Sequence, residues 1–205
     1  EGIQSQHLDK INHASILLNT LIAQVRNLSS YSSGKLKVQM EKVCPVELLD
    51  KLEFLYEEKL REKKLIMRKE IYKSPDSFIC GDMTILLHQV LGNLLSNSIK
   101  FSNENSQIQI KVIEEEDQIK ITVKDFGIGI EEHKLATLFD PNFHTSTKGT
   151  KGEQGTGFGL PLAKTFTTAL GGTIDVLSST EESNSGTTFI LEFPKAKEEI
   201  NSNAA

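Results

Sequence analysis

Apolar residues recur at alternating three- and four-residue steps along the first 31 residues. They are Leu8, Ile11, Leu18, Ile22 and Val25, with Ser15 in the same register and Leu21 and Leu28 widening the stripe. This heptad spacing predicts one long helix over about residues 4–31, of the kind found in coiled coils and helical bundles. Gly34 supplies a stop, because glycine accepts the left-handed conformation that ends helices.

From residue 35 onward the period of the pattern changes repeatedly. Alternating polarity predicts strands at about 35–43, 65–71, 78–80, 108–112, 119–123, 173–178 and 186–193. Helical spacing predicts helices at about 45–63, 83–101, 132–138 and 158–170, the first with Val46, Leu49, Leu52, Leu55 and Tyr56 on one face. This mixed order favours an α/β class, specifically a two-layer α/β sandwich with helices on one face of a mixed sheet.

The pattern divides the chain into three parts. Residues 1–34 carry the long helix, residues 35–195 form the α/β domain, and residues 196–205 are a polar tail that we expect to be disordered. Within the domain, the irregular stretch 141–156 is long for a compact fold. Loops of this length are usually lids or binding loops.

Composition and charge exclude several classes of protein. With 205 residues, 38% of them hydrophobic, and a net charge of −5, the chain has room for one substantial domain and no broad attraction to nucleic acid. No apolar run approaches the roughly 20 residues that cross a bilayer, so we expect no membrane contact by this chain.

Cys44 and Cys80 lack metal-ligand spacing and are expected to be reduced thiols in the cytoplasm. The sequence begins at Glu1, with no Met and no basic stretch, so we expect no signal peptide. We expect the chain to be a piece of a longer protein, and this parent protein could carry a membrane anchor.

Asn93, Asn97 and Lys100 lie four and three residues apart in the predicted helix at 83–101, so they share one face. Asparagine is a poor helix former, so two of them beside a lysine in an apolar helix suggest a polar purpose. Amide oxygens can bind Mg²⁺ alongside phosphate oxygens, and the ammonium can meet phosphate charge. Taken alone, these residues also fit a solvated stripe with a helix cap.

A glycine-rich turn follows the predicted strand at 119–123. It runs Asp125-Phe126-Gly127-Ile128-Gly129-Ile130. A carboxylate at a strand end can accept a hydrogen bond from an exocyclic amine, and neighbouring glycines let a flat base approach the backbone. By itself, the pattern is also that of a tight turn.

A second glycine-rich segment opens the predicted helix at 158–170. It runs Gly155-Thr156-Gly157-Phe158-Gly159-Leu160. Backbone N–H groups and the helix dipole favour phosphate there. The spacing does not fit a dinucleotide-binding fingerprint, because no βαβ unit with a suitably placed acidic residue follows, and no Walker A lysine pattern is present. Gly186-Thr187-Thr188-Phe189, alone, is a turn followed by a strand.

The order of these segments is more specific than any one of them. Asn93…Asn97…Lys100, Asp125-x-Gly-x-Gly, Phe139, Gly155-x-Gly-x-Gly and Gly186-Thr-Thr-Phe resemble the N, G1, F, G2 and G3 boxes of the histidine kinase catalytic domain, of the GHKL superfamily. The resemblance covers about residues 36–194. It implies a Bergerat-type ATP-binding fold with ATP and Mg²⁺ as cofactors. Residues 1–34 then look like the second helix of a dimerisation and phosphotransfer hairpin.

The resemblance implies a role for each matching position. Asp125 would bind the adenine amine, with Gly129 beside the base and Thr188 in support. Asn97 would be the principal Mg²⁺ ligand, with Asn93 near the metal and phosphates. The 141–156 stretch would be the ATP lid, its base anchored by Phe139 and Phe143. Further nucleotide-binding positions would be Lys100, Phe101, Gly127, Ile130, Lys148, Lys151, Gln154, Gly155, Thr156, Gly157, Phe158, Gly159 and Leu160. For Lys148, a merely solvated lysine fits equally well.

Asn93 also bears on the choice between kinase and ATPase. Hydrolytic relatives in the superfamily carry a glutamate at this position to activate water, whereas asparagine cannot act as a general base near neutral pH. We therefore expect slow hydrolysis and a phosphoryl-transfer reaction, with Asn93 and Lys100 as the catalytic residues.

A histidine kinase also needs a phosphoacceptor, usually in a His-Glu/Asp-x-x-x-Pro context on a helix. None of the five histidines fits this context well, namely His7, His13, His88, His133 and His144. We expect each to be a surface residue, with His7 kept as an atypical acceptor, and the true acceptor to lie outside this chain.

The resemblance implies two partners and leaves two alternative functions open. The partners are a response regulator receiver domain and a second copy of the parent protein, bound through the 4–31 helix. One alternative is an anti-sigma-factor-like serine kinase, against which the bundle-like first helix argues. The other is a non-catalytic nucleotide-binding regulator. The filled motif positions argue against loss of ATP binding, though not against loss of transfer.

Overall fold

A computed structural model of the chain describes residues 15, 22, 26, 38–142, 147–153 and 155–197. Of the predicted 4–31 helix, only Ser15, Ile22 and Arg26 fall within this set, and all three are helical and exposed. The rest of that helix, most of the predicted tail, Phe143 and Gln154 lie outside the described residues.

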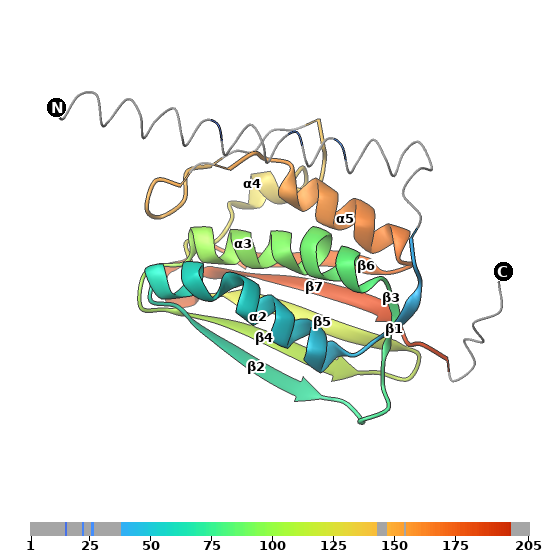
Figure 1. The fold of residues 1–205 in the computed structure, drawn as a ribbon. Helices are drawn as coiled ribbons and strands as arrows, with labels where there is room; N and C mark the ends of the chain where they lie inside the picture. The colour runs from blue at the N-terminus through green and yellow to red at the C-terminus, as the bar shows by residue number, and fades with distance from the viewer. Residues whose placement is uncertain are drawn as a thin grey trace.

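Five strands form one mixed sheet in the order β2-β4-β5-β7-β6 (Figure 1). They are β2 (Ile66–Tyr72), β4 (Gln107–Glu114), β5 (Gln118–Asp125), β6 (Thr173–Ser179) and β7 (Gly186–Pro194). β2 pairs in parallel with β4, and the other neighbours pair antiparallel. Along β4, β5 and β7 every second residue is buried, so one face of the sheet forms the core.

The helices lie on that face, which confirms the predicted two-layer α/β sandwich (Figure 1). They are α2 (Pro45–Glu62), η1 (Ile85–Leu91), α3 (Gly92–Phe101), the short α4 (Glu132–Leu135) and α5 (Gly159–Ala169), and a 3₁₀ turn, η2 (Glu182–Asn184), joins β6 to β7. α3 packs over β5, and α5 packs against both α3 and η1. The helices predicted at 45–63, 83–101, 132–138 and 158–170 are thereby confirmed, with α4 shorter than expected.

The predicted strand at 35–43 was too long at residues 38–40, and residues 35–37 lie outside the described set. Of the described residues 38–43, only β1 (Glu41–Val43) is a strand, and it pairs with the equally short β3 (Ile79–Gly81). Just before β1, the Gln39 N–H donates to the Asp82 carboxylate at 2.9 Å instead of to a neighbouring strand. Met40 is 43% exposed, so the alternation that predicted a longer strand does not reflect burial.

The predicted face of α2 was wrong in part. Leu49 and Leu52 are buried as expected, but Val46 and Leu55 are exposed, and Leu48 is buried in their place. An 18-residue helix that rests on a twisted sheet buries a narrow stripe, here Pro45, Leu48, Leu49, Leu52 and Leu60.

The predicted helix at 83–101 changes type in its middle. η1 is a π-helix, and it becomes the α-helix α3 at Gly92, whose N–H donates to the Leu87 carbonyl five residues earlier. π segments are rare and occur often at functional sites. Here the change of type comes one residue before Asn93.

Within the described ranges, no helix has the length and apolar character needed to cross a membrane. Cys44 and Cys80 are free thiols, as expected. His88 and His133 are exposed, also as expected, while His7, His13 and His144 lie outside the described residues.

Candidate functional site

The carboxylate of Asp125, at the end of β5, is enclosed by three elements. Its Oδ1 accepts hydrogen bonds from the backbone N–H groups of Gly127 and Thr187, both at 3.1 Å. Its Oδ2 accepts one from the Ser98 hydroxyl of α3 at 3.3 Å. Asp125 is 3% exposed, and burial raises its pKa to about 6, although these three donors act in the opposite direction. Oδ2 therefore keeps capacity to accept from a further donor.

Backbone approaches this carboxylate closely at the glycine-rich turn. A Cβ at Gly127 would collide with the Phe101 carbonyl at the end of α3, and the Ile128 N–H donates to the same oxygen at 3.2 Å. Gly129 has a φ of 71°, and a Cβ there would collide with the Ser179 carbonyl. The turn thus packs between the end of α3 and the end of β6.

Ile130 continues the same turn. Its N–H donates to the Ser178 hydroxyl at 2.8 Å, and that hydroxyl in turn donates to the Gly186 carbonyl at 2.8 Å. The Ile130 side chain is partly buried against the core. These bonds tie the turn to the facing ends of β6 and β7.

The prediction that Thr188 supports Asp125 was wrong by one residue. Thr187 pairs with Asp125 across β5 and β7, whereas Thr188 pairs with Lys124. Because side chains alternate along a strand, Thr188 points to the other face of the sheet. Thr187 shares the parity of the buried Phe189, and this alternation was the sequence signal that could have identified it.

Ser98 was also missed by sequence reasoning. It is fully buried on α3 in the same stripe as Leu94 and Leu95. A hydroxyl within an apolar helical stripe needs a hydrogen-bond partner. The position of Ser98 in this stripe could therefore have indicated a buried hydrogen bond. It could not have identified the partner, Asp125, which is 27 residues away in sequence.

The three polar residues of α3 share one half-buried face, as predicted. The Asn93 Nδ2 donates to the Gln89 carbonyl at 2.6 Å, which leaves its Oδ1 free to accept. The Asn97 amide makes no hydrogen bond to another of the described residues. The Lys100 ammonium donates to the Thr147 carbonyl at 2.6 Å and lies 4.7 Å from the centre of the Phe101 ring. Burial lowers the Lys100 pKa, which the charge of Glu153 partly opposes.

The second glycine-rich segment lies along this face of α3. A Cβ added at Gly155 would lie 2.7 Å from Lys100 Nζ, and one added at Gly159 would lie 3.1 Å from Asn93 Oδ1. Gly157 has a φ of 79°, which a side chain disfavours. The segment 155–159 therefore runs along the polar face of α3, with Gly155 at Lys100 and the start of α5 at Asn93.

The remaining predicted positions lie around this face. Phe158 and Leu160 are partly buried against the core, and the Thr156 hydroxyl accepts from the Phe158 N–H at 3.3 Å. Phe139 is also partly buried, and the Lys164 ammonium lies 5.4 Å from its ring centre. Lys148 is exposed.

Lys151 does not point toward the polar face of α3. Its ammonium is 2.5 Å from the Glu104 carboxylate and donates to the Glu62 carbonyl at 3.2 Å. Glu104 follows α3 and Glu62 ends α2, so the Lys151 ammonium is held at the C-terminal ends of these two helices. The predicted phosphate contact by Lys151 does not agree with this arrangement.

The donors on α3 suit a magnesium ion held jointly by the protein and a ligand. No cluster of three or more His, Cys, Asp or Glu side chains suited to a metal occurs in the part of the chain that the structure describes. Asn93 and Asn97 offer neutral amide oxygens, and Lys100 offers a cation beside them. Mg²⁺ is commonly bound by a few protein oxygens with water and phosphate completing its shell.

Comparison with known sequences identifies one matching family. Residues 83–197 match the family described as "Histidine kinase-, DNA gyrase B-, and HSP90-like ATPase". This range contains every element that carries the site, from η1 to β7.

Two curated relatives are sensor proteins of bacteria. The sensor histidine kinase RcsC of Escherichia coli is 31% identical over 190 residues, which is 90% of this chain and 19% of RcsC. The sensor protein SrrB of Staphylococcus aureus is 32% identical over 178 residues, or 87% of this chain and 30% of SrrB. The chain therefore spans less than a third of the length of these relatives.

Solved structures agree with this likeness. The catalytic domain of the histidine kinase ThkA is 28% identical with a TM-score of 0.63, over 78% of this chain and 96% of that domain. A ThkA structure in complex with the response regulator protein TrrA is 26% identical with a TM-score of 0.70, over 91% of this chain and 50% of that chain.

Proposed function

Because this chain belongs to the family of histidine kinase-, DNA gyrase B- and HSP90-like ATPases, we propose that its α/β domain binds Mg-ATP and supplies the γ-phosphoryl group to a histidine. The observation that carries the proposal is the Asp125 carboxylate. It is buried, is oriented by three donors, and has an oxygen with spare acceptor capacity. An adenine amine is a donor suited to that oxygen.

The glycine-rich turn supports adenine at this place. Gly127 and Gly129 let the turn pack against the Phe101 and Ser179 carbonyls, which keeps the backbone of the turn beside Asp125, where we place the base. Phe101 and Ile130 flank the turn and offer apolar surface to the faces of the base. Thr187 takes the supporting position that Thr188 was expected to fill.

The polar face of α3 supports the phosphates and the metal. Asn97 is the principal candidate ligand for Mg²⁺, with the free Oδ1 of Asn93 as a second oxygen. Mg²⁺ would offset charge on the phosphates. Lys100 and the N–H groups at the start of α5 would hold phosphate oxygens, because cations and helix N-termini both stabilise anions. These groups position and stabilise, and they form no covalent bond.

Asn93 favours transfer over hydrolysis. Its amide cannot take a proton from water near neutral pH, and its Nδ2 is engaged with Gln89. We therefore expect steady-state ATP hydrolysis by the purified chain to be slow. Turnover comparable to that of a hydrolytic relative would argue against a kinase.

The phosphoacceptor and the partners follow from the same proposal. The acceptor is a histidine on a dimerisation hairpin to which residues 4–31 contribute a helix, and that helix pairs two copies of the parent protein. The phosphoryl group then passes to an aspartate of a response regulator receiver domain. The ThkA complex with a response regulator protein supports a partner of this kind.

Binding and transfer test the proposal separately. Calorimetry with a non-hydrolysable ATP analogue and Mg²⁺ should show binding by the unaltered chain, and Asp125→Ala should abolish it. Incubation with Mg-ATP and three acceptors should then label a histidine-containing hairpin, and from it a receiver domain, but not a serine protein. Absence of nucleotide binding would overturn the proposal. Labelled serine would favour the serine kinase alternative, and binding without any labelling would favour a nucleotide-binding regulator.

A further inference from the structure

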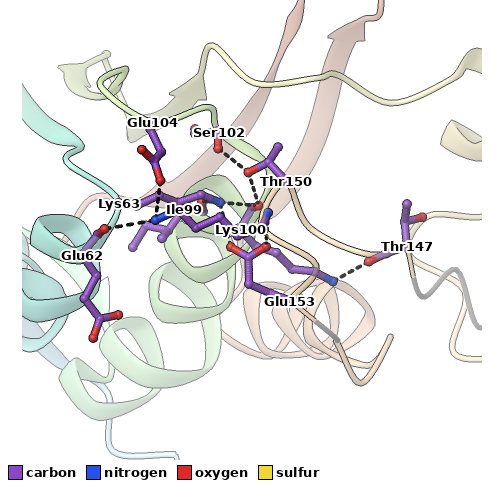
Figure 2. A network of polar contacts seen from close by, with 10 residues as sticks. Glu62, Lys63, Ile99, Lys100, Ser102, Glu104, Thr147, Thr150 and Glu153 are labelled. Atoms are coloured by element: carbon purple, nitrogen blue, oxygen red, sulfur yellow. Dashed lines mark hydrogen bonds and ion pairs between the residues drawn. The ribbon is translucent and has the colours of Figure 1, made fainter.

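Lys63 is a buried cation that the proposed reaction does not use. It follows α2 directly and is 3% exposed. Its ammonium donates to the Ile99 and Lys100 carbonyls, both at 2.7 Å, and to the Glu153 carboxylate at 2.8 Å (Figure 2). All three N–H donors are therefore used. The two carbonyls belong to the last turn of α3, where carbonyl oxygens lack hydrogen-bond partners within the helix. Lys63 therefore supplies donors to the C-terminal end of the helix that carries Asn93, Asn97 and Lys100.

Glu153 connects the same cation to the segment 147–153. Its second carboxylate oxygen accepts from the Lys151 N–H at 2.8 Å, and its backbone carbonyl accepts from the Gly149 N–H at 2.9 Å. Burial acts to raise the Glu153 pKa, but the hydrogen bond from Lys63 and those of the backbone outweigh it and lower that pKa. The carboxylate therefore stays charged near neutral pH and closes a tight turn around itself.

Thr150 fastens this turn to the end of α3. Its N–H donates to the Lys100 carbonyl at 3.1 Å, and its hydroxyl donates to the Ser102 carbonyl at 2.7 Å (Figure 2). Figure 2 shows the Lys63 and Glu153 side chains meeting beside these contacts. The 147–153 segment is thus held on α3 from two sides.

The position of the 147–153 segment on α3 also restricts the Lys100 side chain. With the segment in place, the Thr147 carbonyl accepts from Lys100 Nζ at 2.6 Å, and Gly155 lies against the same nitrogen. The ammonium is therefore kept at the glycine-rich segment that opens α5. Without the segment, the long lysine side chain would sample other rotamers, and ordering it again on binding would cost entropy.

We infer that Lys63 and Glu153 are a positioning pair, which fixes the 147–153 segment on the end of α3 and so holds Lys100 ready for the phosphates of the nucleotide. The inference rests on the proposed function. It concerns residues that touch neither base nor phosphate and act through Lys100.

Glu153→Ala is the main test, because the Glu153 side chain is 35% exposed and its removal leaves Lys63 bonded to two carbonyls. Lys63→Met leaves the Ile99 carbonyl without this donor and the Lys100 carbonyl with Thr150 alone, and it risks unfolding, so it is the secondary variant. The matched control is Lys69→Met. Lys69 lies on β2, and the substitution removes its ion pairs to Asp50 and Glu53 of α2 without touching α3.

The first measurement needs no nucleotide. Amide hydrogen exchange at Thr150, whose N–H is bound to the Lys100 carbonyl, should speed up about tenfold or more in Glu153→Ala and stay unchanged in Lys69→Met. Unchanged exchange in Glu153→Ala would show that the pair does not hold the segment, and would overturn the inference.

The second measurement compares two ligands. In Glu153→Ala, the Kd of a non-hydrolysable ATP analogue with Mg²⁺ should rise about fivefold or more, while the Kd of adenosine stays within about twofold. In the Lys100→Ala background, Glu153→Ala should add no further loss, because its effect passes through Lys100. An equal loss for adenosine, or full additivity with Lys100→Ala, would indicate a merely structural role.

The outcomes separate the two proposals. If the unaltered chain binds the ATP analogue and Glu153→Ala changes nothing, the positioning pair is wrong and the proposed function stands. If the unaltered chain binds no nucleotide, the proposed function fails and the inference fails with it.

Discussion

The Tyr56 hydroxyl of α2 donates a hydrogen bond of 2.9 Å to the Gly92 carbonyl, at the residue where the π-helix η1 becomes α3. A Cβ at Gly92 would lie 2.8 Å from the Leu87 carbonyl and 3.1 Å from the Tyr56 hydroxyl oxygen, so no larger residue fits without movement. Burial raises the pKa of Tyr56, which keeps the donor protonated. The bond fixes the helix one residue before Asn93.

Tyr56→Phe should therefore destabilise the domain by about 1 kcal/mol, because it leaves the Gly92 carbonyl without this donor. Urea unfolding measures the change. Tyr72→Phe is the matched control, since its hydroxyl donates at the surface to Glu70 at 3.2 Å and should contribute little. Equal effects of the two substitutions would contradict a special role for the Tyr56 bond.

Nucleotide binding should depend on the protonation of Asp125, whose pKa in the free protein is about 6. An adenine amine donates a stronger hydrogen bond to an ionised carboxylate than to a protonated carboxyl, so protonation of Asp125 weakens binding. We expect the affinity for adenosine to be about tenfold lower at pH 5 than at pH 8, as measured by calorimetry. Asp125→Asn should bind weakly at both values and show no such dependence. A pH-independent affinity in the unaltered chain would argue against the Asp125 contact.

The same carboxyl should affect stability in the opposite direction with pH. Its pKa is raised from 3.8 to about 6 on folding, so the native state binds the proton more tightly. The resulting stabilisation is complete below pH 4 and is lost as the pH rises through 6, by about 3 kcal/mol in all. Chemical denaturation of Asp125→Asn against the unaltered chain should show that difference, and a shift of the opposite sign would refute it.

Substitutions at Gly129 and Gly152 distinguish two reasons why a position requires glycine, a positive φ and a lack of space for a Cβ. Both have positive φ, at 71° and 83°, but only Gly129 has backbone in the way of a Cβ. Gly152→Ala should cost about 1 kcal/mol from its conformation alone. Gly129→Ala should cost about 3 kcal/mol or more, because the new methyl group collides with Ser179. Thermal unfolding of both variants provides the comparison, and equal losses would mean that the collision is relieved at little cost.

Asn97 should account for much of the magnesium dependence of nucleotide binding. In Asn97→Ala, adding Mg²⁺ should raise the affinity for an ATP analogue far less than in the unaltered chain, while affinity without metal stays similar. Gln109→Ala is the control, since Gln109 pairs with Glu70 on the sheet. A full magnesium effect in Asn97→Ala would exclude Asn97 as a ligand.

Element type and the site motifs were readable from the chain because both depend on near neighbours in sequence. Alternation located β4, β5, β6 and β7, and helical spacing placed Asn93, Asn97 and Lys100 on one face. The π-helix η1 was not predicted, because its apolar residues read equally well as α-helix. The Gly92 contact with α2 that accompanies it joins residues 36 positions apart.

By itself, the sequence determined which segments are helix or strand, which residues carry charge or amide oxygens, and where glycines interrupt the chain. Only the tertiary structure decided that Ser98 and Thr187 meet Asp125, that Lys151 turns away to Glu104, and that Lys63 meets Glu153 across 90 residues. The physical reason is that a hydrogen bond or ion pair acts at short range and requires its two partner atoms to be placed with ångström accuracy. That placement is set by how a helix lies on a sheet, and the local sequence pattern does not contain it.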